Sequence, residues 1–252
     1  PISGLTGCFL FTSCRSAQET TARYEISKVE GNMITIDSTW DANPDKKATT
    51  VLKPYKDKVD AMMYEVIGTS EMKMDKGTPE SLLSNLVASV LQEAAAQVLG
   101  KPADMGLVNM GGLRNILPKG DITVGAVFEI LPFENSLCVL TMKGTDMKRL
   151  FKAIASLHGE GVSGIRLEIN KKGELLNATI GGKPVVDDQL YTVATIDYLA
   201  DGNGRMDAFL QAEKRECPED ATLRGLFLDY VRKQTAEGKI ITSKLDGRIT
   251  VK

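Results

Sequence analysis

A run of apolar residues at helical spacing constrains the fold of this chain more than any other feature. The apolar positions recur every third or fourth residue, at Leu82, Leu83, Leu86, Val87, Val90, Leu91, Ala94, Ala95 and Val98. That spacing gathers them on one face, which is typical of a helix buried against a core. Thr78 is the predicted N-cap, with Pro79 at the first helical position and Glu80 in the first turn. Gly100 marks the predicted end.

Strand patterns follow this helix along the rest of the chain. An apolar strand is predicted at 105–108, and further strands at 136–142, 164–169, 175–180, 190–195 and 248–251. Two more helices are predicted, from Gly144 to about Leu157 and from Thr222 to about Gln234. Alternating strands and helices without repeats predict the α/β class, as an α+β mixed sheet with flanking helices.

The segment before about residue 70 has weaker signals and is predicted to be a looser arm. Residues 23–37 alternate loosely, which predicts a hairpin that turns at Glu30-Gly31-Asn32. Residues 40–48 are polar and predict a loop.

The first residues resemble a targeting segment. Residues 2–13 are small or apolar and carry no charge, and Cys14 follows them. This order resembles the end of a bacterial lipoprotein signal, in which the cysteine receives the lipid. We therefore expect residues 1–22 to be a signal remnant and tether, residues 23–252 to form the domain, and Cys14 to carry the lipid. The location would be periplasmic or at the cell surface, with membrane contact only through the lipid anchor. The alternative is a ragged N-terminus with a chance cysteine.

Cysteine and charge counts exclude several kinds of site. Cys138 and Cys217 permit one disulfide but do not require it, and structural thiols are the favoured interpretation. The chain has no C-x-x-C pair, so no zinc site is expected. A net charge of -2 argues against a nucleic-acid partner.

Histidine content is the strongest limit on catalysis. The only histidine is His158, at a predicted helix end, where a surface or capping position is the favoured interpretation. The motifs D-x-H and G-N-H are both absent. We therefore expect no metal site, no catalytic residue and no cofactor in this chain.

Residues 109–114, N-M-G-G-L-R, combine groups suited to a ligand. Gly111 and Gly112 let the backbone approach a ligand closely. Asn109 offers a donor and an acceptor, and the Arg114 guanidinium presents a fork that suits phosphate oxygens. Taken alone, this pattern is weak, and a tight turn with a surface arginine is the favoured interpretation.

Further motifs follow in a fixed order: G-D-I-T at 120–123, L-P-F-E-N at 131–135, L-T-M-K-G at 140–144, Y-T-V-A-T-I-D-Y-L-A-D-G at 191–202 and D-G-R-I at 246–249. Together with N-M-G-G-L-R, this order resembles the C-terminal domain of the 5′-nucleotidase family, over roughly residues 77–252. The resemblance implies that this is the substrate-binding half of a nucleotidase.

The resemblance also implies roles for individual residues. Phe133 and Tyr198 would stack on the two faces of a base, Asn109 would contact the nucleoside and Arg114 the phosphate. Gly111 and Gly112 belong to the same implied binding set. From the residues alone, the favoured interpretations are a core ring for Phe133 and a half-buried ring with a hydrated hydroxyl for Tyr198.

Two departures from the family pattern affect ligand binding. Gly204 stands where the family usually carries an aspartate for the ribose hydroxyls, and Asp201, Asn203 or Asp207 could substitute for it. We include Asn203 in the predicted binding set. The family also tends to have an arginine before its long helix, where this chain has Thr78-Pro79-Glu80.

The family's chemistry belongs to a separate metallophosphoesterase domain with two divalent metal ions. We therefore expect this chain to be the nucleotide-binding half of a split 5′-nucleotidase in nucleotide catabolism. Its partners would be a nucleotide or nucleoside and a separate metallophosphoesterase chain that holds the metal pair. The alternative is a surface lipoprotein that binds nucleosides or nucleotides and catalyses nothing.

Overall fold

The computed structural model describes residues 25–252, so the predicted lipid site at Cys14 lies outside the described residues. The contacts divide the chain into two units, with the boundary between Thr49 and Thr50. In the first unit, the 3-10 helix η1 (Ser38–Ala42) begins after Asp37, whose side chain accepts a hydrogen bond from the Thr39 N–H at 2.9 Å. Residues 25–37 contain no strand, so the hairpin prediction is wrong for them. An isolated hairpin is marginally stable, and Ile26, Ile34 and their neighbours are exposed.

Helix α1 (Lys46–Met63) starts within the segment predicted to be a loop, which corrects that prediction. The Asp45 carboxylate accepts hydrogen bonds from the backbone N–H groups of Lys47 at 2.8 Å and Ala48 at 2.9 Å. Asp45 therefore acts as the N-cap of this helix. None of the residues of α1 is buried.

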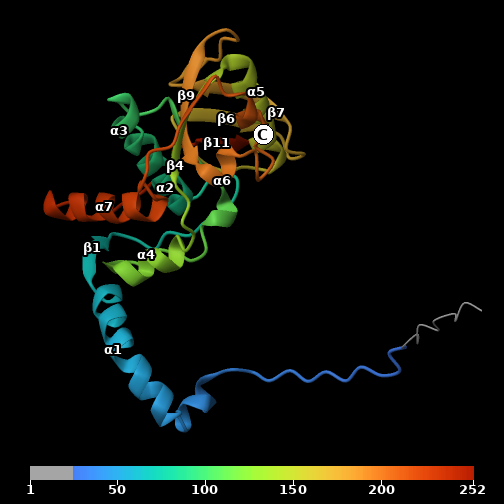
Figure 1. Cartoon of the computed structure of the whole chain (residues 1–252). Coiled ribbons are helices and arrows are strands. Elements are labelled where there is room, and N and C mark those ends of the chain that lie inside the picture. The colour runs from blue at the N-terminus through green and yellow to red at the C-terminus, as the bar shows by residue number, and fades with distance from the viewer. Residues whose placement is uncertain (1–24) are drawn as a thin grey trace, which may run out of the picture. The chain divides into compact units, whose positions relative to one another are not determined.

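The second unit holds most of the regular structure (Figure 1). Its strands are β1 (Val66–Ser70), β2 (Met105–Val108), β3 (Gly120–Thr123), β4 (Leu137–Lys143), β5 (Gly161–Ser163), β6 (Ile165–Ile169), β7 (Leu175–Ile180), β8 (Lys183–Pro184), β9 (Leu190–Ile196), β10 (Lys214–Glu216) and β11 (Ile249–Val251). Its helices beyond α1 are α2 (Leu82–Ala94), α3 (Ala96–Leu99), η2 (Met110–Gly112), α4 (Val124–Ile130), α5 (Gly144–Ser156), α6 (Asp197–Ala200), η3 (Asp207–Gln211) and α7 (Leu223–Ala236).

The strands form three sheets. The central sheet has five strands in the order β10-β4-β9-β2-β5, in which β2 and β9 run parallel and the other pairs are antiparallel. A four-stranded sheet has the order β11-β6-β7-β8, and β1 pairs with β3. Both larger sheets mix parallel and antiparallel pairs, so the predicted α/β class with a mixed sheet and flanking helices is confirmed.

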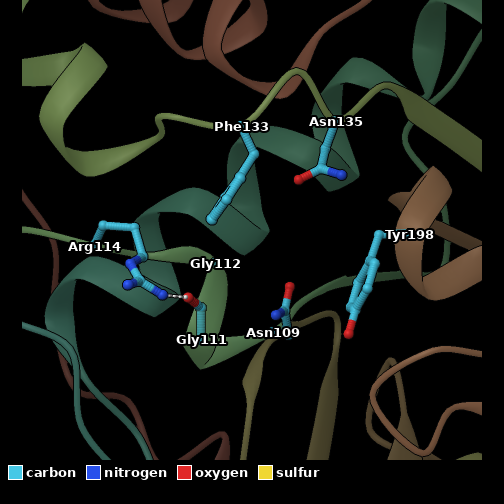
Figure 2. Close-up of a pocket in the computed structure, with 7 residues that line it drawn as sticks. All are labelled: Asn109, Gly111, Gly112, Arg114, Phe133, Asn135 and Tyr198. Atoms are coloured by element: carbon cyan, nitrogen blue, oxygen red, sulfur yellow. Dashed lines mark hydrogen bonds between the residues drawn. The ribbon is translucent and has the colours of Figure 1, made fainter. Parts of the chain in front are cut away.

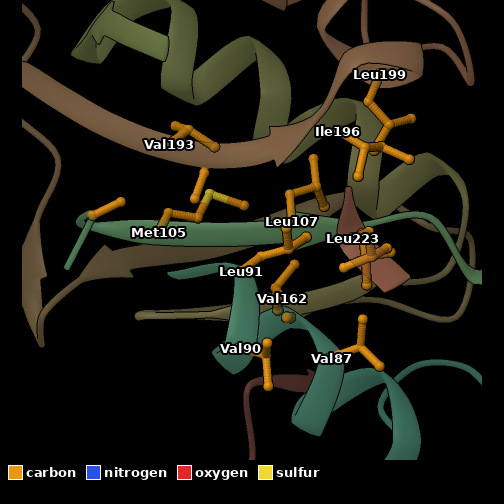
Figure 3. Close-up of a cluster of buried hydrophobic side chains, with 14 of the residues drawn as sticks. Val87, Val90, Leu91, Met105, Leu107, Val162, Val193, Ile196, Leu199 and Leu223 are labelled. Atoms are coloured by element: carbon orange, nitrogen blue, oxygen red, sulfur yellow. The ribbon is translucent and has the colours of Figure 1, made fainter. Parts of the chain in front are cut away.

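Helix α2 packs its apolar face against β2 and β5. Figure 3 shows Leu91 of α2 beside Leu107 of β2, and both are fully buried. The stretch Leu82–Leu99 is long and apolar enough to cross a membrane by length and composition, yet half of it is buried inside the protein. The apolar repeat that dominates the sequence is therefore the core helix of this unit.

The predicted start of this helix is three residues too early. The Ser81 hydroxyl accepts a hydrogen bond from the Ser84 N–H at 3.3 Å, so Ser81 is the N-cap instead of Thr78. Glu80 lies before the helix, and its carboxylate accepts hydrogen bonds from the backbone N–H groups of Asp246 at 3.0 Å and Gly247 at 3.1 Å. Glu80 thus anchors the loop that leads into β11.

The two cysteines of the second unit are linked by a disulfide, which overturns the preference for free thiols. Register explains the link, because β10 pairs Glu216 with Val139 of β4 and the next residues along are Cys217 and Cys138. Arg215 lies against the bond, with its Nε 3.3 Å from the Cys217 sulfur.

Candidate functional site

One edge of the central sheet brings four chain segments together. Strands β2 and β9 are parallel neighbours, so both end at this edge. Strand β4 is antiparallel to β9 and β5 is antiparallel to β2, so both of those begin there. The segments that follow β2 and β9 and precede β4 and β5 therefore meet, although they are distant in sequence.

The segment after β2 is the tight turn around η2. The Gly112 N–H donates to the Asn109 carbonyl at 3.0 Å, which closes the turn. A Cβ on Gly112 would lie 3.0 Å from the Asn109 side-chain oxygen, so a larger residue would displace that amide. The Arg114 N–H donates to the Ile130 carbonyl at 2.9 Å, which ties the turn to the end of α4.

The segment before β4 carries Phe133, and a buried arginine at the start of α7 holds it. The Arg224 guanidinium donates to the Leu131 carbonyl at 3.1 Å and to the Glu134 carboxylate, so it binds the loop on both sides of Phe133. Its Cζ lies 4.1 Å from the centre of the Phe128 ring, a cation–π contact. Arg224 of α7 thus fixes the position of the loop that carries Phe133.

The segment after β9 carries Tyr198 on the short helix α6. The Asp197 N–H donates to the Ser136 carbonyl at 2.9 Å, which joins this helix to the segment before β4. The Asp197 carboxylate accepts a hydrogen bond from the Asn135 side-chain amide at 3.0 Å. The two ring-bearing segments are therefore bonded directly to each other.

These segments enclose a cavity of about 350 Å³, lined by Asn109, Gly111, Gly112, Arg114, Phe133, Asn135 and Tyr198. Figure 2 shows the rings of Phe133 and Tyr198 nearly edge-on, on opposite sides of the cavity. Phe133 is 49% exposed and Tyr198 is 44% exposed. Phe133 is consequently not a core ring, and both rings present surface to the cavity.

Every predicted binding residue except Asn203 lines this cavity. Asn203 lies in the exposed loop after α6, where its carbonyl accepts a hydrogen bond from the Met206 N–H at 3.2 Å. Asp201 pairs with Arg215 at 2.7 Å, and Asp207 lines a different cavity. Among the described residues, no carboxylate lines the cavity between the rings.

Two cations lie at the turn. The Arg114 guanidinium donates to the Gly111 carbonyl at 3.5 Å, and its Cζ lies 5.9 Å from the centre of the Phe133 ring. The Lys76 ammonium donates to the carbonyls of Met110, at 3.5 Å, and Leu113. An anionic group at this end of the cavity would meet positive charge.

The described residues do not supply the ligands that a pair of metal ions needs. Residues 25–252 contain no group of three histidine, cysteine, aspartate or glutamate side chains placed to hold a metal ion. His158 is exposed at the end of α5, at the surface position that its sequence context predicts.

Glu160 lies just beneath the turn, immediately before β5. Its carboxylate accepts a hydrogen bond from the Met110 N–H, which helps to hold the turn. Burial raises the pKa of Glu160 to about 7 from its ordinary value of 4.5, although the Met110 hydrogen bond acts in the opposite direction. The folded state therefore favours the protonated carboxyl group.

This shift predicts a pH-dependent effect of Glu160→Gln. Because the pKa of Glu160 is raised in the folded state, its contribution to the free energy of unfolding is fully present below about pH 4.5. That contribution is lost as the pH rises through about 7. Glutamine keeps an acceptor for the Met110 N–H and carries no charge. We expect Glu160→Gln to raise the free energy of unfolding by about 3 kcal/mol at pH 8 and to leave it nearly unchanged at pH 4.5.

Urea unfolding at the two pH values measures this effect. Glu219→Gln serves as the control, since Glu219 is an exposed glutamate. Equal stabilities of wild type and Glu160→Gln at pH 8 would contradict a buried, charge-disfavouring site.

The sequence patterns do not identify Asn135 and Glu160 as residues of the site. Asn135 could have been found, because it stands two residues after Phe133 and precedes a strand that starts at the same edge. Glu160 had a weaker signal, a single acid between two glycines before a three-residue strand.

Comparison with known proteins adds to this geometry. Endonuclease YhcR of Bacillus subtilis is 28% identical over 188 residues, which cover 71% of this chain and 15% of that protein. The cell wall protein Lmo0130 of Listeria monocytogenes is 27% identical over 240 residues, which cover 84% of this chain and 30% of that protein. The solved 5′-nucleotidase precursor from Thermus thermophilus superposes with a TM-score of 0.69 at 26% identity, over 84% of this chain and 44% of that one.

The chain spans less than half the length of each of these proteins. The family described as 5′-nucleotidase, C-terminal domain, matches residues 66–211, from β1 to the end of η3. That match covers more than half of the chain and includes all the residues that line the cavity. The chain therefore belongs to the 5′-nucleotidase C-terminal domain family.

Proposed function

We propose that the cavity binds a nucleotide, with the base between Phe133 and Tyr198 and the phosphate towards Arg114. The observation that carries this proposal is the pair of half-exposed rings on opposite sides of one cavity (Figure 2). A flat base can fill the space between two such rings, and stacking contributes about 1–3 kcal/mol per base. A volume of about 350 Å³ is within the range of small-molecule sites.

Asn109 suits the middle of this ligand. Its side-chain oxygen is buried and has no hydrogen-bond partner within the described chain. A buried carbonyl oxygen without a donor is unfavourable by about 1–3 kcal/mol, so a ligand hydroxyl that donates to it would bind favourably. Sugar hydroxyl groups supply such a donor.

The wider role we propose is that of the nucleotide-binding half of a split 5′-nucleotidase, acting in nucleotide catabolism. A separate metallophosphoesterase chain would supply the metal pair and the hydrolysis. Family membership and the lack of a metal-ligand cluster in residues 25–252 support this role. Phosphate release from nucleotides is measured with divalent metal, with and without the candidate partner. Hydrolysis by this chain alone would refute the proposal that a separate chain supplies the catalytic site.

A second candidate is a surface protein that binds nucleosides or nucleotides and catalyses nothing. The departures from the family pattern favour it, because no carboxylate among the described residues lines the cavity and Glu80 is engaged by the loop at 246–248. Tight binding combined with no hydrolysis in the presence of any phosphoesterase partner would select this function.

We also propose that the protein is lipid-anchored through Cys14 outside the cytoplasm. The disulfide between Cys138 and Cys217 supports such a location, since disulfides persist in oxidising compartments. The relative from Listeria is named a cell wall protein. Mass spectrometry of the protein extracted from membranes tests this directly, and an unmodified Cys14 would refute the anchor.

The position of Arg114 makes a prediction about the phosphate. Arg114→Ala should weaken binding of a nucleoside monophosphate roughly tenfold and leave binding of the matching nucleoside nearly unchanged, because only the phosphate meets the guanidinium. Titration calorimetry with adenosine and its monophosphate measures both. Arg149→Ala is the matched control, since Arg149 is a surface arginine on α5 that pairs with Asp146. Equal losses for the two ligands would place the phosphate elsewhere.

A further inference from the structure

We propose that Asp197 is a positioning residue that fixes the direction of the Asn135 amide, so that the cavity selects bases that carry an amino group. This inference rests on the proposed function, because it names the class of base held between the rings. Asp197 itself does not line the cavity.

The first step is the bonding of one carboxylate oxygen. Oδ1 of Asp197 accepts a hydrogen bond from Nδ2 of Asn135 at 3.0 Å and another from the Tyr198 N–H at 2.7 Å. The Asp197 N–H donates to the Ser136 carbonyl at 2.9 Å. Asp197 therefore contacts both segments that carry the rings, and it determines how Asn135 lies between them.

The second step is the orientation of the amide. An ionised carboxylate can only accept hydrogen bonds, so the NH₂ end of Asn135 must face Asp197 and the carbonyl oxygen must face away from it. In Figure 2 the Asn135 nitrogen points towards the Tyr198 side and its oxygen towards the Phe133 side of the cavity. That oxygen accepts no hydrogen bond from the described residues, so it is free for a ligand.

The third step is the chemistry of the base edge. An acceptor fixed between two stacking rings meets the rim of the stacked base. Adenine and cytosine present an amino donor on that rim, whereas uracil and hypoxanthine carry a carbonyl oxygen in the same place. A carbonyl opposite the Asn135 oxygen would leave both acceptors unpaired, which a hydrogen-bonding site discriminates against strongly. We expect cytidine to bind roughly tenfold more tightly than uridine, and adenosine roughly tenfold more tightly than inosine.

The test is titration calorimetry of wild type and Asp197→Asn with these two pairs of nucleosides. An amide at position 197 can donate or accept, so the Asn135 amide is free to turn. The preference within each pair should then fall from about tenfold to about one. A purely structural role would instead weaken both members of a pair equally. Asp121→Asn is the control, because Asp121 is an exposed aspartate on β3 outside the cavity, and it should keep the preference.

A second variant covers the case in which Asp197→Asn does not fold. Asn135→Ala keeps the bond between Asp197 and the Tyr198 N–H and removes the acceptor, so it should also abolish the preference. Absence of any nucleoside binding by wild type would refute the proposed function. Wild-type binding without a preference, or a preference that survives in a folded Asp197→Asn or Asn135→Ala protein, would overturn the role of Asp197 alone.

Discussion

Replacing both Cys138 and Cys217 with serine is expected to lower the free energy of unfolding by about 4 kcal/mol. The disulfide joins residues 79 apart in the sequence, and a cross-link that closes a loop of this length restricts the unfolded chain strongly. It also fastens the edge strand β10 to β4, which starts beside the ligand cavity. The loss should therefore appear in the whole second unit as one cooperative transition.

Urea unfolding of oxidised wild type and of the double serine variant measures this loss. Wild type in the presence of a reducing agent is the control, and it should unfold at the same urea concentration as the variant. Thiol titration of denatured, unreduced wild type should show no reaction from these two cysteines. A loss below about 1 kcal/mol, or thiol labelling of Cys138 and Cys217 in the denatured, unreduced protein, would contradict the cross-link.

Phe133→Ala and Tyr198→Ala are each expected to weaken nucleoside binding between about tenfold and about a hundredfold. Each substitution removes one stacking face and leaves the hydrogen bonds of Asn109 and Asn135 available. Both rings are about half exposed, so the variants should keep nearly the wild-type free energy of unfolding. Calorimetry with one nucleoside, together with thermal unfolding, separates the two effects.

Matched substitutions test whether the aromatic face itself accounts for the loss of binding. Phe133→Tyr and Tyr198→Phe keep an aromatic face and should retain binding within a few-fold of wild type. Tyr64→Ala removes an exposed ring that lies outside the cavity and should change nothing. Unchanged affinity in both alanine variants would remove the rings from the site.

The sequence predicts the core of this fold well because its signals there are periodic and long. The apolar face of α2, the buried strand β2, the β4–α5 pair and the start of α7 at Thr222 all agree with the structure. Each of these elements is buried along one face or, as in β2, at every position, so the apolar residues report it directly.

Elements with little burial of their own escape such patterns. Helix α1 has no buried residue, so it carries no sufficient apolar signal, and only Asp45 marks its start. Strands β1 and β3 pair mainly with each other, and β10 is a short edge strand, so their existence depends on tertiary partners. The predicted start of α2 is too early because Glu80 lies outside the helix and bonds to a loop more than 160 residues away. Local sequence cannot reveal such a partner.

The candidate site likewise combines features that the sequence indicates with features that depend on tertiary structure. The residue types at 109–114, 133 and 198 point to a ligand, but only the parallel register of β2 and β9 brings those segments to one edge. The link between Asn135 and Asp197 spans 62 residues and depends on that register. Sequence could name most of the groups, and the sheet topology determines how they are combined.

A crystal structure of the protein with a bound nucleoside monophosphate tests the central claim most directly. Our account predicts the base between the rings of Phe133 and Tyr198, with its amino group towards the Asn135 oxygen and its phosphate within hydrogen-bonding distance of Arg114. A ligand bound elsewhere, or a base that contacts neither ring, would contradict it.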